Sequence, residues 1–333
     1  MKLQVPSGAA TAIGSLPHRD AAAAAAFALD HLADLPTLPT LPRRSPAEGM
    51  IAQAVLGIQG ITLGQYGTIS VDVGRIDLAA PVVTDLDHDG FAGFRAFLGA
   101  AAGRTGAVKW QFVGPVTLGV ALMRAGVPSA LAFPVAVHAV RSHVDALQQH
   151  VAASMPDAQQ VIFLDEPSFP EVSDPDFPLA LDTAIDSVSG ALAMIEQTSV
   201  PGVHCCGDAD WASLLAAGPS VLSLPVTDNV ARVAGYLARF LDSGGWIAWG
   251  AVPTDGPIPH TSERPWRNLS KLWCDLVNAG CDAVQLRTQS LITPACGLGL
   301  HSEAVAKRVF RLTNEISHRV HSQAVATRLS IGA

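Results

Sequence analysis

Short apolar segments alternate with longer stretches of helical composition along most of the chain. Amphipathic or alanine-rich stretches such as residues 182–197 and 262–279 separate the apolar segments. Strands that alternate with helices pair in parallel, because each helix returns the chain to the same edge of the sheet. The segments that predict buried strands cover residues 11–15, 35–41, 107–113, 160–164, 200–203, 220–224, 245–249 and 282–286.

Eight such units favour a single (β/α)8 barrel over residues 1–333, with its active site at the carboxyl ends of the strands. An open doubly wound sheet is the alternative, but its G-x-G-x-x-G signature is absent after the first segment. Residues 43–97 show no strand–helix unit of their own, so we expect a long insertion after the second strand. Residues 323–333 are expected to form a flexible tail.

Composition narrows the class of protein. Apolar residues make up 49% of the 333 positions and charged residues 15%, which is enough for a large core and excludes general disorder. Lys and Arg number 21 against 29 Asp and Glu, a net charge of −8 with no basic run. This balance argues against nucleic acid and anionic membranes as partners. The alanine-rich run 21–29 is too short to span a bilayer.

Cysteine usage favours a reducing compartment. Five cysteines, two of them adjacent, do not make a disulfide framework, and residues 1–10 lack the pattern of a signal peptide. We therefore expect a cytoplasmic protein. The sequence leaves the oligomeric state open.

The sharpest local pattern is the run His204-Cys205-Cys206 at the end of a predicted strand. Side chains two apart on an extended segment point to the same face, so His204 and Cys206 could bind one ion. Cys296 follows the last strand and is expected at the same rim. One imidazole and two thiolates suit a catalytic Zn²⁺ with an open fourth position. The alternatives are that these are small packed residues, or that Cys205 takes part. Cys274 and Cys281 are expected in the core.

Other polar residues also gather where strands end. Asp165 and Glu166 follow a strand, and such an acidic pair is costly to bury unless it is paired. Asp165 could hold a substrate ammonium and Glu166 could act as a base, although a helix cap is the alternative. Gly14 and Ser15 offer backbone N–H groups to a carboxylate.

Two further side chains, Gln111 and Trp249, are candidates for substrate binding. Gln111 and Lys109 face one side of their strand together, toward the barrel interior or toward the helices. Trp249 could stack on a flat ligand, although a tryptophan at that spacing more often belongs to the core.

In order along the chain, these pieces resemble the C-terminal catalytic barrel of cobalamin-independent methionine synthase. That barrel belongs to the superfamily of uroporphyrinogen decarboxylase and the zinc thiol methyltransferases of methanogens. Each matching segment is short, but together they span almost the whole length. They are residues 13–17 (IGSLP), 114–117 (GPVT), 165–167 (DEP), 204–206 (HCC) and 294–298 (PACGL).

The resemblance implies a zinc-dependent methyltransferase of methionine biosynthesis. A thiol such as homocysteine would be activated as a zinc thiolate and methylated by a folate, a corrinoid protein or another small methylated compound. His204, Cys206 and Cys296 match the family's zinc ligands. Residues 13–15 (Ile13, Gly14 and Ser15) match the segment that holds the substrate carboxylate, and Asp165 matches the acid that holds its ammonium.

The chain also departs from this family. The synthase has a fourth ligand, a glutamate at the end of the next strand, where this chain has residues 223–228 (SLPVTD). A copy of the duplicated N-terminal barrel and a clear copy of the homocysteine-contacting glutamate segment are missing. The methyl donor therefore stays open. A methanogen-type thiol methyltransferase, a decarboxylase-like lyase with Arg19 as its nearest arginine, and a non-catalytic binding barrel are the alternatives.

Overall fold

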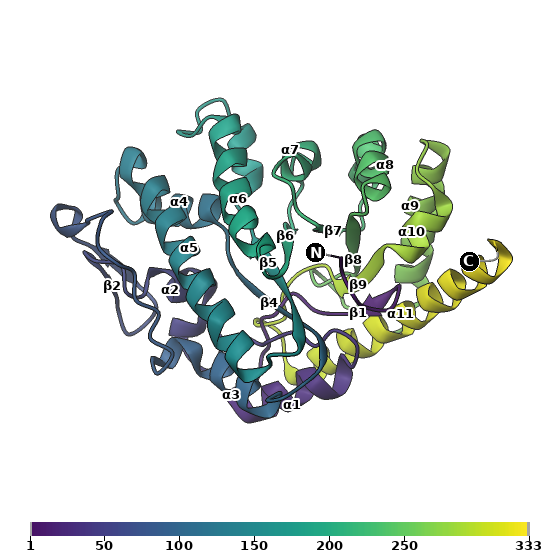
Figure 1. Ribbon diagram of the computed structural model, residues 1–333, viewed down its shortest axis with the longest axis horizontal. Coiled ribbons are helices and arrows are strands. Elements are labelled where there is room, and N and C mark those ends of the chain that lie inside the picture. Colours follow the sequence, from purple (N-terminus) through teal and green to yellow (C-terminus); the bar gives the residue numbers. More distant parts are fainter. Residues whose placement is uncertain (1, 332–333) are drawn as a thin grey trace.

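The computed structural model describes residues 2–331. Seven parallel strands form one curled sheet in the order β1-β9-β8-β7-β6-β5-β4, a half-barrel with helices around it (Figure 1). The α/β class predicted from the alternation is confirmed. The strands are β1 (Ala9–Ala10), β4 (Gly106–Val113), β5 (Ala158–Asp165), β6 (Val200–His204), β7 (Val221–Pro225), β8 (Trp246–Val252) and β9 (Ser290–Pro294).

The helices follow the strands as crossovers. The long helix α5 (Ser129–Ser154) packs beside β4 and β5, and α6 (Leu181–Glu196) packs beside β6. Helix α11 (Glu303–Ile331) runs from β9 along the sheet to the C-terminal end (Figure 1). The α-helices are α1 (Ala21–His31), α2 (Met50–Val55), α3 (Ala92–Ala100), α4 (Pro115–Arg124), α5 (Ser129–Ser154), α6 (Leu181–Glu196), α7 (Trp211–Ala216), α8 (Ala234–Asp242), α9 (Glu263–Asn278), α10 (Ala283–Thr288) and α11 (Glu303–Ile331).

The eighth strand expected at residues 35–41 does not form a continuous ladder. Thr37 makes an isolated parallel bridge to Lys109, and Thr40 makes one to Ser15, so the segment lies between β4 and the chain that follows β1. Prolines at 36, 39 and 42 lack the N–H that a ladder needs at each position. A full eight-stranded barrel is therefore not confirmed.

Two strand predictions at the ends of the chain are wrong. Residues 282–286 belong to a helix cap and α10, because Asp282 accepts hydrogen bonds from the backbone N–H groups of Val284 and Gln285 and starts a helix. The strand is β9, whose five residues are all buried. The first strand is β1, which precedes the predicted residues 11–15.

The insertion at 43–97 has structure of its own. It contains α2, a hairpin of β2 (Ile61–Leu63) and β3 (Ile69–Val71), and the start of α3. Three short 3-10 helices complete it: η1 (Pro46–Glu48), η2 (Val73–Arg75) and η3 (Asp89–Phe91). The predicted tail at 323–333 is helical as far as Ile331, and residues 332–333 lie outside the described residues.

A hydrophobic cluster fills the inside of the curled sheet. Every strand of the sheet and the 35–41 segment contribute to it, which shows that their inner faces converge. Polar side chains replace apolar ones nearer the carboxyl ends, where the cluster stops. Its buried members are Leu3, Ala9, Leu35, Ala107, Val161, Phe163, Val200, Val221, Ala248 and Leu291.

Candidate metal centre and substrate cavity

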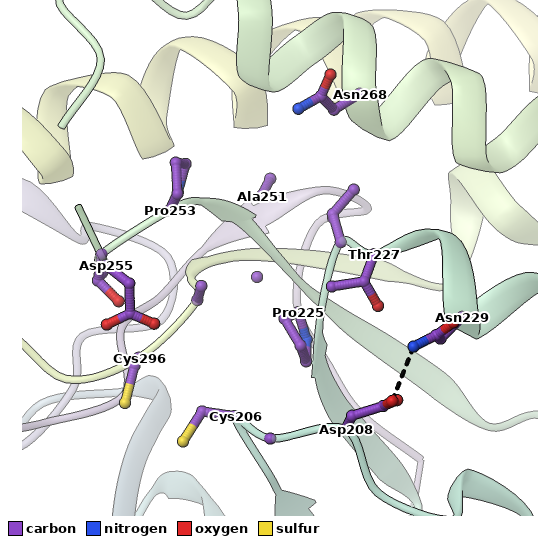
Figure 2. A pocket seen from close by; sticks show the side chains of 15 residues that line it. Cys206, Asp208, Pro225, Thr227, Asn229, Ala251, Pro253, Asp255, Asn268 and Cys296 are labelled. Carbon is purple, nitrogen blue, oxygen red and sulfur yellow. Dashed lines mark hydrogen bonds between the residues drawn. The ribbon is translucent and has the colours of Figure 1, made fainter. Parts of the chain in front are cut away.

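His204, Cys206 and Cys296 meet at the carboxyl end of the sheet. His204 ends β6, Cys206 follows two residues later, and Cys296 lies on the loop after β9. One ligand atom from each residue lies within 4.8 Å of the others. Figure 2 shows the two sulfur atoms pointing toward the same space. The spacing of two residues and the proximity of the loop after the last strand produce the group expected from the sequence.

The imidazole of His204 is already oriented for a metal. Its Nδ1 shares a hydrogen bond of 2.9 Å with the hydroxyl of Ser223 on β7, whereas its Nε2 is buried without a hydrogen-bond partner. A buried nitrogen with no partner is costly unless something absent from the protein atoms satisfies it. Ligands on a tetrahedral zinc lie about 3.3–3.8 Å apart, given bonds of about 2.0–2.3 Å. The three residues therefore fit a zinc ion after a small contraction.

The pKa values of the two thiols are shifted in opposite directions. A hydrogen bond from the Cys296 thiol lowers the pKa of Cys206, and the same bond together with burial raises the pKa of Cys296. Cys205 points into the hydrophobic core, where burial raises the pKa of its thiol to about 12. Cys205 is therefore separated from His204, Cys206 and Cys296, which we call the metal group. Cys281 is buried as expected, but Cys274 is exposed on α9, so its predicted place in the core is wrong.

A cavity of about 550 Å³ opens beside the metal group. Its volume is in the range of small-molecule sites. The insertion supplies one wall, with Glu48, Met50 and Gln53. The structure brings seven of the predicted site residues to this cavity: Ile13, Ser15, Gln111, Asp165, His204, Cys206 and Cys296.

Asp165 is one of two buried acids that line the cavity, the other being Glu48. The side chain of Asp165 lies at the end of β5 beside His204, with which it pairs across the strands. Its Oδ1 is buried and has no hydrogen-bond partner. Burial raises the pKa of this carboxyl, while His204 and Lys109 act in the opposite direction. An unpaired carboxylate in a cavity can bind a ligand ammonium.

Glu166 lies elsewhere. It is fully buried, does not line the cavity, and its carboxylate accepts hydrogen bonds from both backbone N–H groups of Val116 and Thr117 at 2.9 and 2.8 Å. The Thr117 hydroxyl donates a third, at 2.7 Å. Burial raises the pKa of Glu166 to about 7, but these donors lower it. Glu166 therefore caps α4, an earlier helix, and it neither caps the helix that follows it nor contacts the cavity as a base would.

Trp249 also lies outside the cavity. It has no exposed surface, and its indole N–H donates to the Ser290 hydroxyl at 2.9 Å. Its neighbour Ala248 belongs to the cluster inside the sheet, so alternation turns Trp249 outward against Trp273 of α9. The position of Trp249 gives no support to a role in substrate binding.

Gly14 is not a lining residue, but it shapes the wall. Its φ of +139° is a conformation that L-residues rarely adopt, and an added Cβ would lie 1.9 Å from Gln111 Nε2. The next residue, Ser15, accepts a hydrogen bond from the N–H of Gly299 at 3.2 Å. The glycine thus lets the chain pass close to Gln111 while Ser15 is fixed against the loop that carries Cys296.

We expect Gly14→Ala to destabilise the fold by about 2–3 kcal/mol, because it adds backbone strain and displaces Gln111. Urea unfolding measures the change. Gly103 is a matched control, since its φ is also positive, at +71°, but an added Cβ meets nothing within 4 Å. Gly103→Ala should cost only about 1 kcal/mol. Equal losses of unfolding free energy in the two variants would contradict the close approach of Gly14 to Gln111.

Lys109 and Glu48 are two buried charged residues that the sequence analysis did not assign to the site. Lys109 Nζ donates to the Ile13 carbonyl at 2.6 Å and to Gln111 Oε1 at 2.9 Å, below the cavity. Burial lowers its pKa to about 7. Strand alternation placed Lys109 beside Gln111, but it gave no sign that the amine would bind the 13–15 segment.

Glu48 comes from the insertion. Its Oε2 accepts the Leu41 N–H at 2.9 Å, and Arg44 lies 3.1 Å from its Oε1. Burial raises the pKa of Glu48 from 4.5 to about 7, because its effect is larger than the opposite effect of the Leu41 N–H and Arg44. No spacing in the sequence marks this residue, because the insertion has no periodic pattern.

Glu48 gives the stability a pH dependence of known sign. Between pH 4.5 and about 7 the folded state holds a proton that the unfolded carboxyl has lost, so stability falls as pH rises through this window. Its contribution is at most about 3 kcal/mol. Glu48→Gln should remove this part of the slope in urea unfolding measured at several pH values.

Asp89→Asn is the control, because Asp89 also contacts Arg44 but its pKa is lowered, by the hydrogen bond from Arg44. Asp89 therefore stays ionised between pH 4.5 and about 7. If Glu48→Gln left the pH dependence of the unfolding free energy unchanged, it would contradict the assignment of that dependence to Glu48.

Comparison with known proteins identifies the fold. No protein-family model and no curated protein matches this chain. Among solved structures, a Listeria monocytogenes protein provisionally identified as a vitamin-B12-independent methionine synthase matches with a TM-score of 0.61 and 14% identity. The match covers 96% of this chain and 98% of that one. At this identity it shows a shared fold.

A second match is too distant to indicate a common fold. Bee venom hyaluronidase, in complex with a hyaluronic acid tetramer, has a TM-score of 0.34 and 11% identity, over 78% of this chain and 80% of its own. Separately, no helix among residues 2–331 is long and apolar enough to cross a membrane.

Proposed function

We propose that this protein is a zinc-dependent methyltransferase that activates a thiol amino acid, with homocysteine as the first candidate. The observation that carries the proposal is the convergence of His204, Cys206 and Cys296 within 4.8 Å at the edge of a cavity. The fold shared with the Listeria protein and the ordered sequence segments support the same activity. Zn²⁺ bound there would deprotonate a substrate thiol and keep its sulfur nucleophilic.

The protein's own residues position the amino acid. Asp165 offers an unpaired oxygen for the substrate ammonium. The 13–15 segment, which Lys109 holds through the Ile13 carbonyl, would bind the carboxylate. Ser223 fixes His204 so that Nε2 faces the metal group. Together these contacts would place the thiol of homocysteine at the open ligand position.

Residues 223–228 contain no glutamate that could be a fourth ligand, which bears on the number of protein ligands. Ser223 contacts His204 Nδ1. Asp228 begins η5 (Asp228–Val233), lies outside the cavity, and forms an ion pair of 3.0 Å with Lys271 of α9. Three protein ligands would leave the fourth position to the substrate thiolate. This arrangement favours a thiol methyltransferase of the methanogen type over one with four protein ligands.

A decarboxylase-like lyase is less compatible with the cavity. Such an enzyme needs cations for several substrate carboxylates, but neither lysine nor arginine is among the described residues that line the cavity. Carboxylates of Glu48, Asp165 and Asp255 line it instead. The charges therefore favour a substrate that carries an ammonium.

The test is thiol binding followed by methyl transfer. Cobalt-substituted protein should gain intensity in its thiolate charge-transfer bands when homocysteine is added. Methionine formation would then be measured by mass spectrometry with 5-methyltetrahydrofolate, methylcobalamin or small methylated compounds as donors. Cys296→Ser should lose both signals and Cys274→Ser, on the exposed face of α9, should keep them. Homocysteine that leaves the spectrum unchanged would refute the proposal and support a non-catalytic barrel.

A further inference from the structure

A second hollow adjoins the metal group on its other flank. Its volume is about 280 Å³, and the loops after β6, β7 and β8 surround it (Figure 2). It shares Cys206, Thr254, Asp255 and Cys296 with the larger cavity. The two thiols therefore stand at the boundary between two separate spaces. We call this second space the rim hollow.

The rim hollow carries two exposed carboxylates and is acidic. Asp208 and Asp255 supply two carboxylates, and Asn229 donates to Asp208 at 2.8 Å. Among the described residues, no lysine, arginine or histidine lines it. An adjoining hollow contains Lys271, which forms ion pairs with two aspartates, Asp228 and Asp275. The electrostatic potential here therefore favours a cation and disfavours an anion.

Thr254 provides an independent sign of a missing ligand. It lines both spaces and is 4% exposed, and its hydroxyl oxygen is buried without a hydrogen-bond partner. Buried hydroxyls normally have a partner, so an unpaired one beside the thiols indicates a group that the protein itself does not supply.

We propose that the rim hollow binds the methyl donor, and that this donor is a small onium compound with its methyl group on a sulfonium sulfur or a quaternary nitrogen. This inference rests on the proposed function, which places the thiol substrate in the larger cavity. The volume of about 280 Å³ suits a small ligand better than a pteridine with a glutamate tail. The tail of such a folate is also anionic and would meet two carboxylates but no cationic side chain among the described lining residues.

The chemistry balances without a further reactant. The substrate thiolate sulfur forms a bond to the methyl carbon while the bond from that carbon to the onium atom breaks. The electron pair of the broken bond stays on the departing sulfur or nitrogen. An anion and a cation thus give two neutral products, a thioether and a sulfide or amine. The neutral leaving product loses its attraction to Asp208 and Asp255, which favours release.

Direct binding tests the inference on the full chain without methyl transfer. Trimethylsulfonium and tetramethylammonium are the probes, and dimethyl sulfide is the uncharged counterpart; saturation-transfer NMR titrations give their dissociation constants. We expect at least one cation to bind and dimethyl sulfide to bind more weakly. Both aspartates are exposed, so Asp208→Asn and Asp255→Asn should each weaken cation binding roughly two- to fivefold, as for exposed charge pairs. Asp228→Asn, outside the rim hollow, is the matched control and should change nothing.

Two outcomes would overturn the inference while leaving the proposed function intact. One is homocysteine binding to the cobalt protein without any onium binding. The other is onium binding that Asp208→Asn, Asp255→Asn and Asp228→Asn affect equally. The preference between the two cations identifies the donor atom. Onium binding together with a failure to bind homocysteine would refute the proposed function, and the donor role of the hollow with it.

Discussion

Cys296→Ala is expected to reduce the zinc content of the purified protein from about one ion per chain to background. The thiol is one of three candidate ligands within 4.8 Å, and no other described residue joins that group. Losing one of three protein ligands should weaken zinc binding by more than about 100-fold, the upper range for loss of an outer-shell partner. Methyl transfer to homocysteine should fall at least as far.

Cys274→Ala is the matched control, because it removes an exposed thiol on α9 that lies outside the metal group. Mass spectrometry of the metal in both variants and in wild type measures the effect. Equal zinc content in Cys296→Ala and Cys274→Ala would contradict the assignment of Cys296. His204→Ala should behave like Cys296→Ala, since its Nε2 is the unpaired nitrogen of the group.

Asp165→Asn is expected to raise the KM for homocysteine by about 100-fold and to leave zinc content unchanged. The variant keeps the size of the side chain but removes the charge that would face the substrate ammonium, and a buried charge pair is worth about 2–5 kcal/mol. A thiol without the amino group, 4-mercaptobutyrate, separates this effect from a general loss of structure.

Wild-type protein should prefer homocysteine over 4-mercaptobutyrate strongly, and Asp165→Asn should lose most of that preference. The readout is the ratio of the two dissociation constants, measured by the cobalt charge-transfer bands. A variant that loses affinity for both thiols equally would show that Asp165 supports the cavity wall and does not bind the ammonium.

The sequence predicts the convergence of His204, Cys206 and Cys296, and the part of that geometry that joins His204 to Cys206 is local. The end of β6 at His204 fixes the extended segment, and a spacing of two residues places Cys206 on the same side. Cys296 follows from the general rule that loops after parallel strands share one rim. The strands β4 to β8 lie close to the predicted segments, since each is apolar and bounded by turn residues.

Other parts of the site depend on tertiary contacts that no spacing reveals. Glu48 reaches the cavity because the insertion folds over it, and nothing in residues 43–97 indicates that path. Glu166 follows Asp165 directly, yet the turn directs it to the start of α4. Trp249 faces outward because Ala248 takes the inner position. Alternation alone does not say whether the odd-numbered or the even-numbered residues of a strand face the inside of the sheet. Prolines in the 35–41 segment interrupt the ladder that its apolar pattern predicts.

The most direct test of the central claim is zinc X-ray absorption spectroscopy of the purified protein with and without homocysteine. The site predicts two sulfur ligands from Cys206 and Cys296 and one nitrogen from His204 in the free protein, with the remaining position taken by oxygen. Adding homocysteine should raise the sulfur count from two to three. A spectrum without sulfur ligands, or a sulfur count that homocysteine leaves unchanged, would contradict the account.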